Sequence, residues 1–243
     1  MYKRQDDLLQ EVLKYLDVTS LVEKKQVCTH WKNLCTRTID QKNGGVPRPF
    51  QNRDELRNAI LKYISSINNP KDAEKIAASY GWPIGKWDVS NVTSFFYIFE
   101  DCSTFNEDIS SWDASNVTNM SCTFYGASRF NQPISQWDTS KVRSMNYMFF
   151  GATSFNQSLV DWDVSSVTTM SKMFSRATSF NQPLTDWDVS SVTDMSYMFL
   201  GATSFKQSLT DWDVSRVQLN VGMFTAATSF DVALLAPKNF VRR

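Results

Sequence analysis

Residues 187–209, WDVSSVTDMSYMFLGATSFKQSL, decide the fold because they are one copy of a unit that recurs six times. A tryptophan followed by an aspartate opens each unit, and successive tryptophans stand 25 residues apart. The six are Trp87, Trp112, Trp137, Trp162, Trp187 and Trp212. Phenylalanine keeps the same step from Phe105 to Phe230. A fixed period in this range indicates a repeat architecture in which each unit contacts its neighbours.

Although each Trp-Asp pair is typical of a β-propeller, a propeller blade needs about 40–45 residues. A unit of 25 residues fits the leucine-rich-repeat size class, with one strand and one helical stretch. Trp187 and Val189 would share a strand face, and the residues at 190–191 would form a turn. A helical stripe is indicated by Val192, Met195, Met198, Phe199 and Ala202. We therefore predict an α/β solenoid of strand–turn–short-helix units, preceded by a small all-α module.

The Trp-Asp-Val-Ser, Met-Phe and Ala-Thr-Ser-Phe-Asn-Gln blocks occur in this order in successive units. They resemble the BspA-type leucine-rich repeat, which is found in bacterial surface proteins and in many protist proteins. The resemblance covers residues 83 to 235. It implies a leucine-rich-repeat-like, right-handed superhelix that binds protein, and it implies no ligand or cofactor.

Two polar columns follow from the repeat. Asparagine follows phenylalanine at Asn106, Asn131, Asn156 and Asn181, and we expect a buried amide ladder that satisfies turn backbone groups. Aspartate follows every tryptophan, and carboxylates about 4.8 Å apart repel by roughly 3–4 kcal/mol at an effective dielectric of 20. Serine stands two residues after each aspartate. Turn amides and this hydroxyl are expected to neutralise the column, and a bound cation is the alternative.

Other positions change type from unit to unit, ten and thirteen residues after each tryptophan. They carry the predicted target-binding residues Tyr97, Tyr125, Tyr147, Phe150, Tyr197 and Leu200. Aromatic side chains are enriched in binding hot spots, and an exposed row of them indicates an interaction surface. The alternative is that they are buried by lateral packing between units.

The N-terminal segment LLQEVLKYLDVTSLVEKKQVCTHWKNLC (residues 8–35) has the apolar spacing of short amphipathic helices. It resembles an F-box, although Asp6 stands where the usual opening Leu-Pro has its proline. The resemblance implies docking to a Skp-type adaptor within a cullin ubiquitin ligase. The adaptor-binding residues it implies are Leu9, Val12, Leu13, Leu16, Leu21, Val27 and Trp31. The alternative is a helical cap of the solenoid.

These patterns divide the chain into an F-box-like module (1–41), a linker (42–51), a helical cap (52–82), the repeats (83–235) and a tail (236–243). Two glycines and two prolines indicate the linker. Asn52 is the expected N-cap of a helix whose apolar face is Leu56, Ala59, Ile60 and Tyr63. A second helix is expected to start near Pro70 and to end at Gly81.

Composition and motif content argue against several classes of function. Formal net charge is zero, which gives no basis for a nucleic-acid or anionic-membrane partner. No apolar run is long enough for a membrane span, and the first residues do not read as a secretory signal. Four scattered cysteines favour a reducing compartment, the cytoplasm or nucleus. Cys28, His30 and Cys35 lack a fourth zinc ligand at a suitable spacing. No catalytic motif and no cofactor site is recognised.

We therefore expect a substrate-recognition subunit of an F-box ubiquitin ligase, in which the repeats bind the target. The rival is a surface or secreted adhesion protein, for which the sequons at Asn91, Asn116, Asn119 and Asn156 would carry glycan. A third reading is a repeat scaffold with no ligase role.

Overall fold

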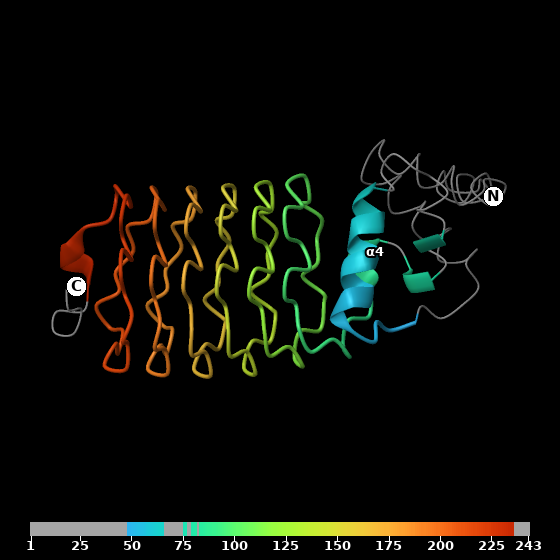
Figure 1. Ribbon diagram of the computed structural model, residues 1–243, viewed down its shortest axis with the longest axis horizontal. Helices are drawn as coiled ribbons and strands as arrows, with labels where there is room; N and C mark the ends of the chain where they lie inside the picture. Colours follow the sequence, from blue (N-terminus) through green and yellow to red (C-terminus); the bar gives the residue numbers. More distant parts are fainter. Residues whose placement is uncertain (1–47, 66–74, 77–78, 82, 236–243) are drawn as a thin grey trace, which may run out of the picture.

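A computed structural model of the chain describes residues 48–65, 75–76, 79–81 and 83–235. The repeat units lie one beside the next in a single row, which we call the stack (Figure 1). Helix α4 (Arg53–Ser65) lies across one end of the stack, and the 3₁₀ turn η3 (Val232–Leu234) lies at the other end. A further 3₁₀ turn, η2 (Ile84–Lys86), leads into the first unit. Isolated parallel β-bridges join residues 25 apart along the stack, from Ser94 to Leu219.

The predicted short helix in each unit is wrong. In residues 187–209 the backbone closes three-residue turns, in which Met198 N–H donates to the Met195 carbonyl and Leu200 N–H donates to the Tyr197 carbonyl, both at 3.1 Å. Tyr197 and Gly201 have φ values of +57° and +67°. An α-helix of L-residues does not contain these left-handed values. The position of Tyr197 is left-handed in all six units. The predicted strand position is wrong as well: the structure assigns no strand to residues 187–189, and the parallel bridge of this unit lies at Asp194, within the predicted helical stretch.

Contacts between units explain why turns replace the helix. Alternate N–H groups donate to the next unit: Tyr197 N–H to the Val221 carbonyl and Phe199 N–H to the Met223 carbonyl, both at 2.8 Å. A helix would direct the same N–H groups to carbonyls four residues earlier in their own unit. The stacked neighbour thus takes half of the donors, and tight turns take the others. The five residues of the predicted stripe are nevertheless fully buried, so the core prediction is correct although the backbone prediction is not.

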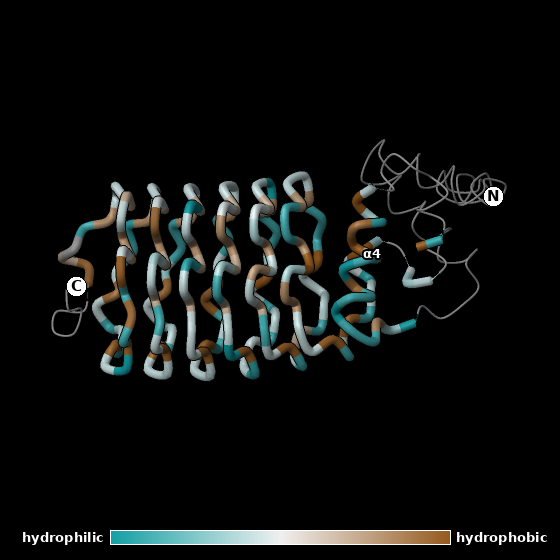
Figure 2. The backbone as a smooth tube through the Cα atoms, in the orientation of Figure 1, coloured by the Kyte–Doolittle hydropathy of each residue, from teal (hydrophilic) through white to brown (hydrophobic). Residues whose placement is uncertain are grey.

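Aromatic rings form the centre of the stack, where brown apolar segments alternate with polar ones along each unit (Figure 2). The buried rings from Phe99 to Phe224 stack on one another at 5.3–5.6 Å between centroids. Each of the later five tryptophans also donates its indole N–H to a carbonyl 28 residues earlier, as Trp162 does to Ile134 at 2.9 Å. These five tryptophans are therefore bonded to the chain of the preceding unit as well as packed in the core, whereas Trp87 donates to the Gly81 carbonyl at 3.1 Å.

The asparagine ladder is present. The Oδ1 atoms of Asn106, Asn131, Asn156 and Asn181 each accept the main-chain N–H of the residue 25 positions later, at 2.8–3.0 Å. Each Oδ1 also accepts the amide of a glutamine side chain in the next unit, at 2.9–3.0 Å. The ladder lies at the surface rather than in the interior, because Asn106 is exposed and the other three are half-buried.

The aspartate column is neutralised locally, as expected. Each of the six aspartates accepts, through Oδ1, the N–H of the serine two residues later at 3.0–3.1 Å. In three units the serine hydroxyl donates to the same atom at 2.6 Å. These bonds, with the Ser140 hydroxyl first, hold the pKa of Asp138 below its usual range. The tryptophan, phenylalanine, asparagine and aspartate positions are called the repeated columns below.

Helix α4 covers the N-terminal end of the stack. Its buried residues are Leu56, Ala59, Ile60 and Tyr63, which confirms the predicted face. Asn52 Oδ1 accepts the Glu55 N–H at 3.0 Å, which confirms the predicted N-cap. Glu55 returns a bond by accepting the Gln51 N–H at 2.8 Å. The first bond caps α4, and the second ties the residue before the cap to the first turn, a variant of the capping box, in which the N–H of the capping residue itself is the usual donor.

The linker prediction is wrong at its C-terminal end. Phe50 is fully buried, and its ring stacks on Tyr80 at 4.1 Å between centroids. Its N–H donates to the Asp88 carbonyl at 2.9 Å. Glycine and proline describe only the local backbone, whereas the phenylalanine side chain ties this segment to the cap. Tyr80 is helical and Gly81 follows it with a φ of +83°, as expected for a helix that ends there.

The last unit ends the stack differently. Leu219 is 53% exposed and Val221 is 44% exposed, at positions where four or five of the earlier units have polar residues. The Leu234 carbonyl accepts Leu209 N–H at 2.8 Å, so η3 covers only part of this end. The final unit closes the stack less completely than α4 does.

Candidate protein-binding surface

The predicted target-binding residues lie in two adjoining columns that we call the variable stripe. Ten residues after each tryptophan stand Tyr97, Cys122, Tyr147, Lys172, Tyr197 and Gly222. Thirteen residues after it stand Glu100, Tyr125, Phe150, Ser175, Leu200 and Thr225. All six predicted residues are half-buried. Each therefore combines the two alternatives, because it packs laterally on neighbouring units and still presents part of its surface to solvent.

Aromatic rings in the second and third units form one cluster on the stripe. Tyr125 and Phe150 stack at 4.7 Å with an interplanar angle of 7°, and Tyr147 lies 5.9 Å from Phe150. Rings held in this way lose little conformational freedom on binding, which favours their use as anchors. At the start of the stripe, the pKa of Tyr97 is raised to about 12, and the largest cause is a side-chain hydrogen bond with Cys122.

Cations enter the stripe in the fourth unit. Lys172 Nζ lies 4.8 Å from the Tyr147 ring centroid and 5.4 Å from that of Tyr197. It also donates to the Tyr147 hydroxyl at 2.7 Å. The Arg176 guanidinium lies 5.5 Å from the Phe150 ring centroid. Cation–π contacts of this kind hold both charges over the aromatic surface.

Sequence reasoning missed Arg176. It belongs to a column one residue beyond the stripe, where Gly126, Gly151 and Gly201 occupy other units. The structure gives Arg176 the same left-handed backbone, with a φ of +59°. Asp101 and Ala226 are the other non-glycine residues of the column, so the signal that could have identified Arg176 was a cation at a position beside the stripe where three units have glycine.

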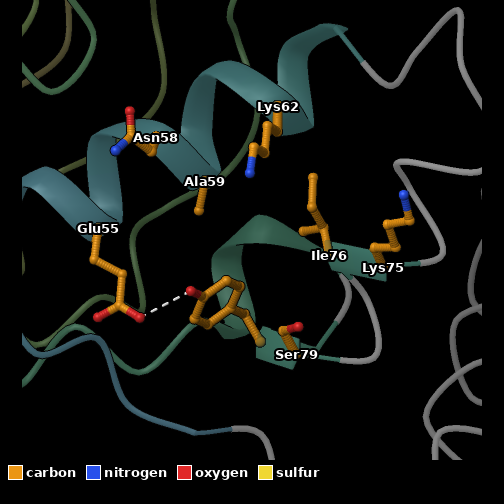
Figure 3. A pocket seen from close by; sticks show the side chains of 8 residues that line it. Glu55, Asn58, Ala59, Lys62, Lys75, Ile76 and Ser79 are labelled. Carbon is orange, nitrogen blue, oxygen red and sulfur yellow. Dashed lines mark hydrogen bonds between the residues drawn. The ribbon is translucent and has the colours of Figure 1, made fainter.

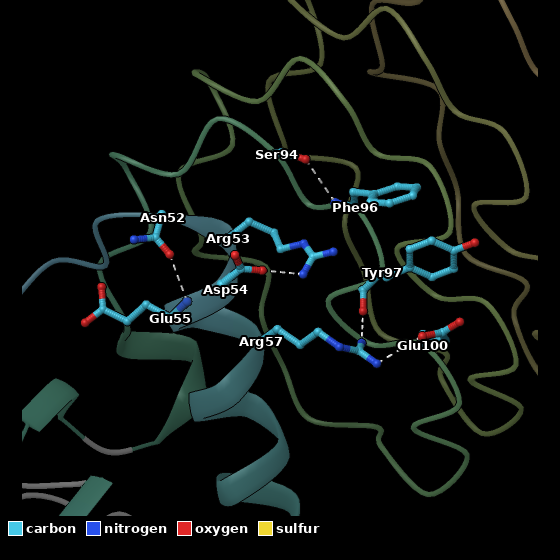
Figure 4. Close-up of polar contacts among 9 residues, drawn as sticks. All are labelled: Asn52, Arg53, Asp54, Glu55, Arg57, Ser94, Phe96, Tyr97 and Glu100. Carbon is cyan, nitrogen blue, oxygen red and sulfur yellow. Dashed lines mark hydrogen bonds and ion pairs between the residues drawn. The ribbon is translucent and has the colours of Figure 1, made fainter.

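The N-terminal end of the stripe is joined to α4 (Figure 4). Arg57 pairs with Glu100 at 3.0 Å and also donates to the Tyr97 carbonyl. The Arg53 guanidinium lies 5.7 Å from the Phe96 ring centroid. The first unit therefore uses its acidic stripe residue to hold α4, which leaves the second to fifth units for a partner.

A separate pocket of about 400 Å³ lies between α4 and the helical residues near position 76 (Figure 3). It is lined by Glu55, Asn58, Ala59, Lys62, Lys75, Ile76, Ser79 and Tyr80. Glu55 is engaged by the Tyr80 hydroxyl at 2.9 Å and by Arg48 at 2.6 Å. The Glu55 carboxylate therefore stabilises the helical cap by joining α4 to Tyr80 and Arg48.

Within the described ranges, no group of three or more histidine, cysteine, aspartate or glutamate side chains could hold a metal ion. None of the helices described there is long and apolar enough to cross a membrane. The predicted adaptor-binding residues, Leu9 to Trp31, lie outside the described residues, as do Cys28, His30 and Cys35.

Comparison with known proteins gives two matches. Residues 47–160 and 131–236 both match the family described as "Mycoplasma protein of unknown function, DUF285". Residues 6–40 match the F-box domain. No curated protein and no solved structure matches the chain. The F-box match confirms the predicted N-terminal domain, and the start of the DUF285 match at residue 47 agrees with the correction to the linker.

Proposed function

Because the chain belongs to the DUF285 family and also carries an F-box domain, we propose that it is a substrate-recognition subunit of an F-box ubiquitin ligase. In this proposal the F-box domain binds a Skp-type adaptor that connects to a cullin scaffold. The stack, which we propose to be a right-handed solenoid of the BspA type, binds the target protein. F-box domains act as protein-interaction adaptors, so the chain would position a substrate rather than modify it.

The observation that carries the target-binding role is the half-buried aromatic cluster of Tyr125, Tyr147 and Phe150. The repeated columns bond within the stack, whereas the stripe adds a surface that the regular stacking does not require. Rigid, partly exposed aromatic rings are the usual centres of binding energy in protein interfaces.

Three of the four sequons, at Asn116, Asn119 and Asn156, are hydrogen-bonded within the stack. Asn156 Oδ1 accepts the Asn181 N–H at 2.9 Å, and Asn116 donates to the Ser90 carbonyl at 2.9 Å. Asn119 Oδ1 accepts the Ser121 N–H at 2.9 Å. The fourth sequon, at Asn91, is exposed. The F-box match supports a location in the cytoplasm or nucleus.

The adaptor role is tested by binding of the full chain to a purified Skp-type adaptor, measured by calorimetry. We expect binding at micromolar concentrations or tighter, and its loss in the double variant Leu16→Ala and Trp31→Ala. The variant Tyr147→Ser plus Phe150→Ser is the matched control, because it alters the stack and should keep adaptor binding. Absence of binding by the unmodified chain would rule out the ligase role.

The target role is tested by quantitative purification from cells that express the chain. Proteins specific to the target site should be retained by the unmodified chain and by the Leu16→Ala and Trp31→Ala variant. They should be lost from the Tyr147→Ser and Phe150→Ser variant. If the stripe variant retains the same proteins, the target site lies elsewhere on the stack.

A further inference from the structure

The variable stripe changes its chemistry at the unit that begins with Trp162. The preceding unit has Tyr147, Phe150 and Gly151 at the two stripe positions and the adjoining glycine position, and the following unit has Tyr197, Leu200 and Gly201. At the equivalent positions this unit has Lys172, Ser175 and Arg176. The second to fifth units of the stripe thus have one polar, cationic unit set between apolar ones.

The two cations are positioned but not neutralised. Among the residues that the structure describes, neither Lys172 nor Arg176 forms an ion pair. Lys172 donates one N–H to the Tyr147 hydroxyl. An ammonium group has three N–H donors, so two others are not used by this bond. The rings of Tyr147 and Tyr197 fix its position without removing its charge.

Arg176 stands in a backbone conformation that disfavours it. Its φ is +59°, in a column where three other units have glycine and where Asp101 and Ala226 are left-handed as well. A side chain in the left-handed region carries a conformational cost that glycine avoids. Such residues concentrate at functional sites, where the side chain has a use that offsets the cost.

Ser175 stands at the stripe position where the neighbouring units have Phe150 and Leu200. It is fully buried, and its Oγ has no hydrogen-bond partner among the described residues. A buried hydroxyl without a partner is unfavourable, because it has lost water and gained no bond. Ser175 is enclosed by the stack, so at this stripe position the unit presents no side chain to a partner, and its exposed chemistry is that of Lys172 and Arg176.

We propose that Lys172 and Arg176 form a recognition site for one anionic group, a carboxylate or a phosphate, on the target protein. Phe150 and Leu200 on either side would contact apolar residues that flank the anionic group. The inference rests on the proposed target-binding function and specifies its ligand chemistry. A nucleic acid fits less well, because binding along a phosphate backbone requires cations in successive units, whereas the second, third and fifth units have none at these positions.

The test uses three synthetic peptide libraries, each randomised around a fixed central residue: phosphoserine, glutamate or glutamine. The immobilised full chain should retain peptides from a library with a charged centre, and the glutamine library should be retained about tenfold less, the loss expected for one charge-assisted bond. Preference for the phosphoserine or the glutamate library identifies the source of the anionic group. Equal retention of all three libraries, or no retention of any, overturns the proposal.

Variants then assign the selected peptides to the site. Lys172→Gln and Arg176→Gly should each reduce retention about tenfold or more, while the melting temperature stays within a few degrees of the unmodified chain. Lys206→Gln is the matched control, because Lys206 is exposed and lies outside the stripe. If Tyr147→Ser plus Phe150→Ser abolishes retention but Lys172→Gln and Arg176→Gly do not, the stripe binds targets and the anionic site is wrong.

Discussion

The repeated columns hold one residue type in nearly every unit, whereas the variable stripe changes type from each unit to the next. Phe149 and Phe150 show the difference between the two regions within one dipeptide. Phe149 is fully buried and stacks on Phe124 and Phe174 at 5.5 Å on both sides, whereas Phe150 is half-buried and stacks on Tyr125. The comparison teaches that a residue repeats where it must fit identical neighbours above and below. It is free to vary where one side faces solvent.

The largest effect is expected for Phe149→Ala, which should lower the free energy of unfolding by about 3–5 kcal/mol because it opens a cavity between two stacked rings. Phe150→Ala, the adjacent control, should cost about 1 kcal/mol from one lost aromatic contact. Urea denaturation measures both values. Equal losses would show that the stripe is part of the core, and the distinction between the two regions would then fail.

Asn156→Ala should cost about 1–3 kcal/mol, because it leaves the Asn181 N–H without its acceptor. The control is Lys206→Ala in the same column. Because the Lys206 side chain is exposed, this change should alter the free energy of unfolding by no more than about 0.5 kcal/mol. Asn156→Asp, which keeps the acceptor oxygen, should retain more stability than Asn156→Ala. A ladder that does not stabilise the stack would give the same unfolding midpoint for all three variants.

The aspartate column predicts acid sensitivity. The pKa values of Asp113, Asp138, Asp188 and Asp213 are lowered by bonds from serine, so folding favours their ionised forms. Their stabilisation is present above the unfolded pKa of about 3.9 and is lost as pH falls through the lower folded value. Ser140→Ala should raise the pKa of Asp138 in an NMR titration. An Asp138 pKa at or above 3.9 in the unmodified chain would contradict this account.

The smallest change in the free energy of unfolding is expected for Arg176→Gly, which should stabilise the protein rather than destabilise it. Glycine relieves the left-handed strain but gains freedom in the unfolded chain, so stability should rise by no more than about 1 kcal/mol. Gly151→Arg, in the preceding unit, is the reciprocal variant and should lower stability. A large loss of stability in Arg176→Gly would show that Arg176 serves the fold rather than binding.

Much of this protein could be predicted from the period alone. Once units of 25 residues are aligned, the side chains that must contact their copies can be identified. The predicted apolar stripe and the hydrogen bonds of the asparagine and aspartate columns agree with the structure, although the asparagine ladder is not buried as predicted. The buried face of α4 and its cap at Asn52 could likewise be predicted from the sequence, because local capping chemistry and apolar spacing do not depend on distant contacts.

The course of the backbone between those positions was decided by tertiary structure. Spacing at three and four residues fits an α-helix and also fits successive tight turns, and the sequence of one unit does not separate them. The stacked neighbour does, because it accepts alternate N–H groups such as that of Tyr197. For the same reason, the contacts of Phe50, Lys172 and Arg176 with residues distant in the sequence became visible only in the folded structure.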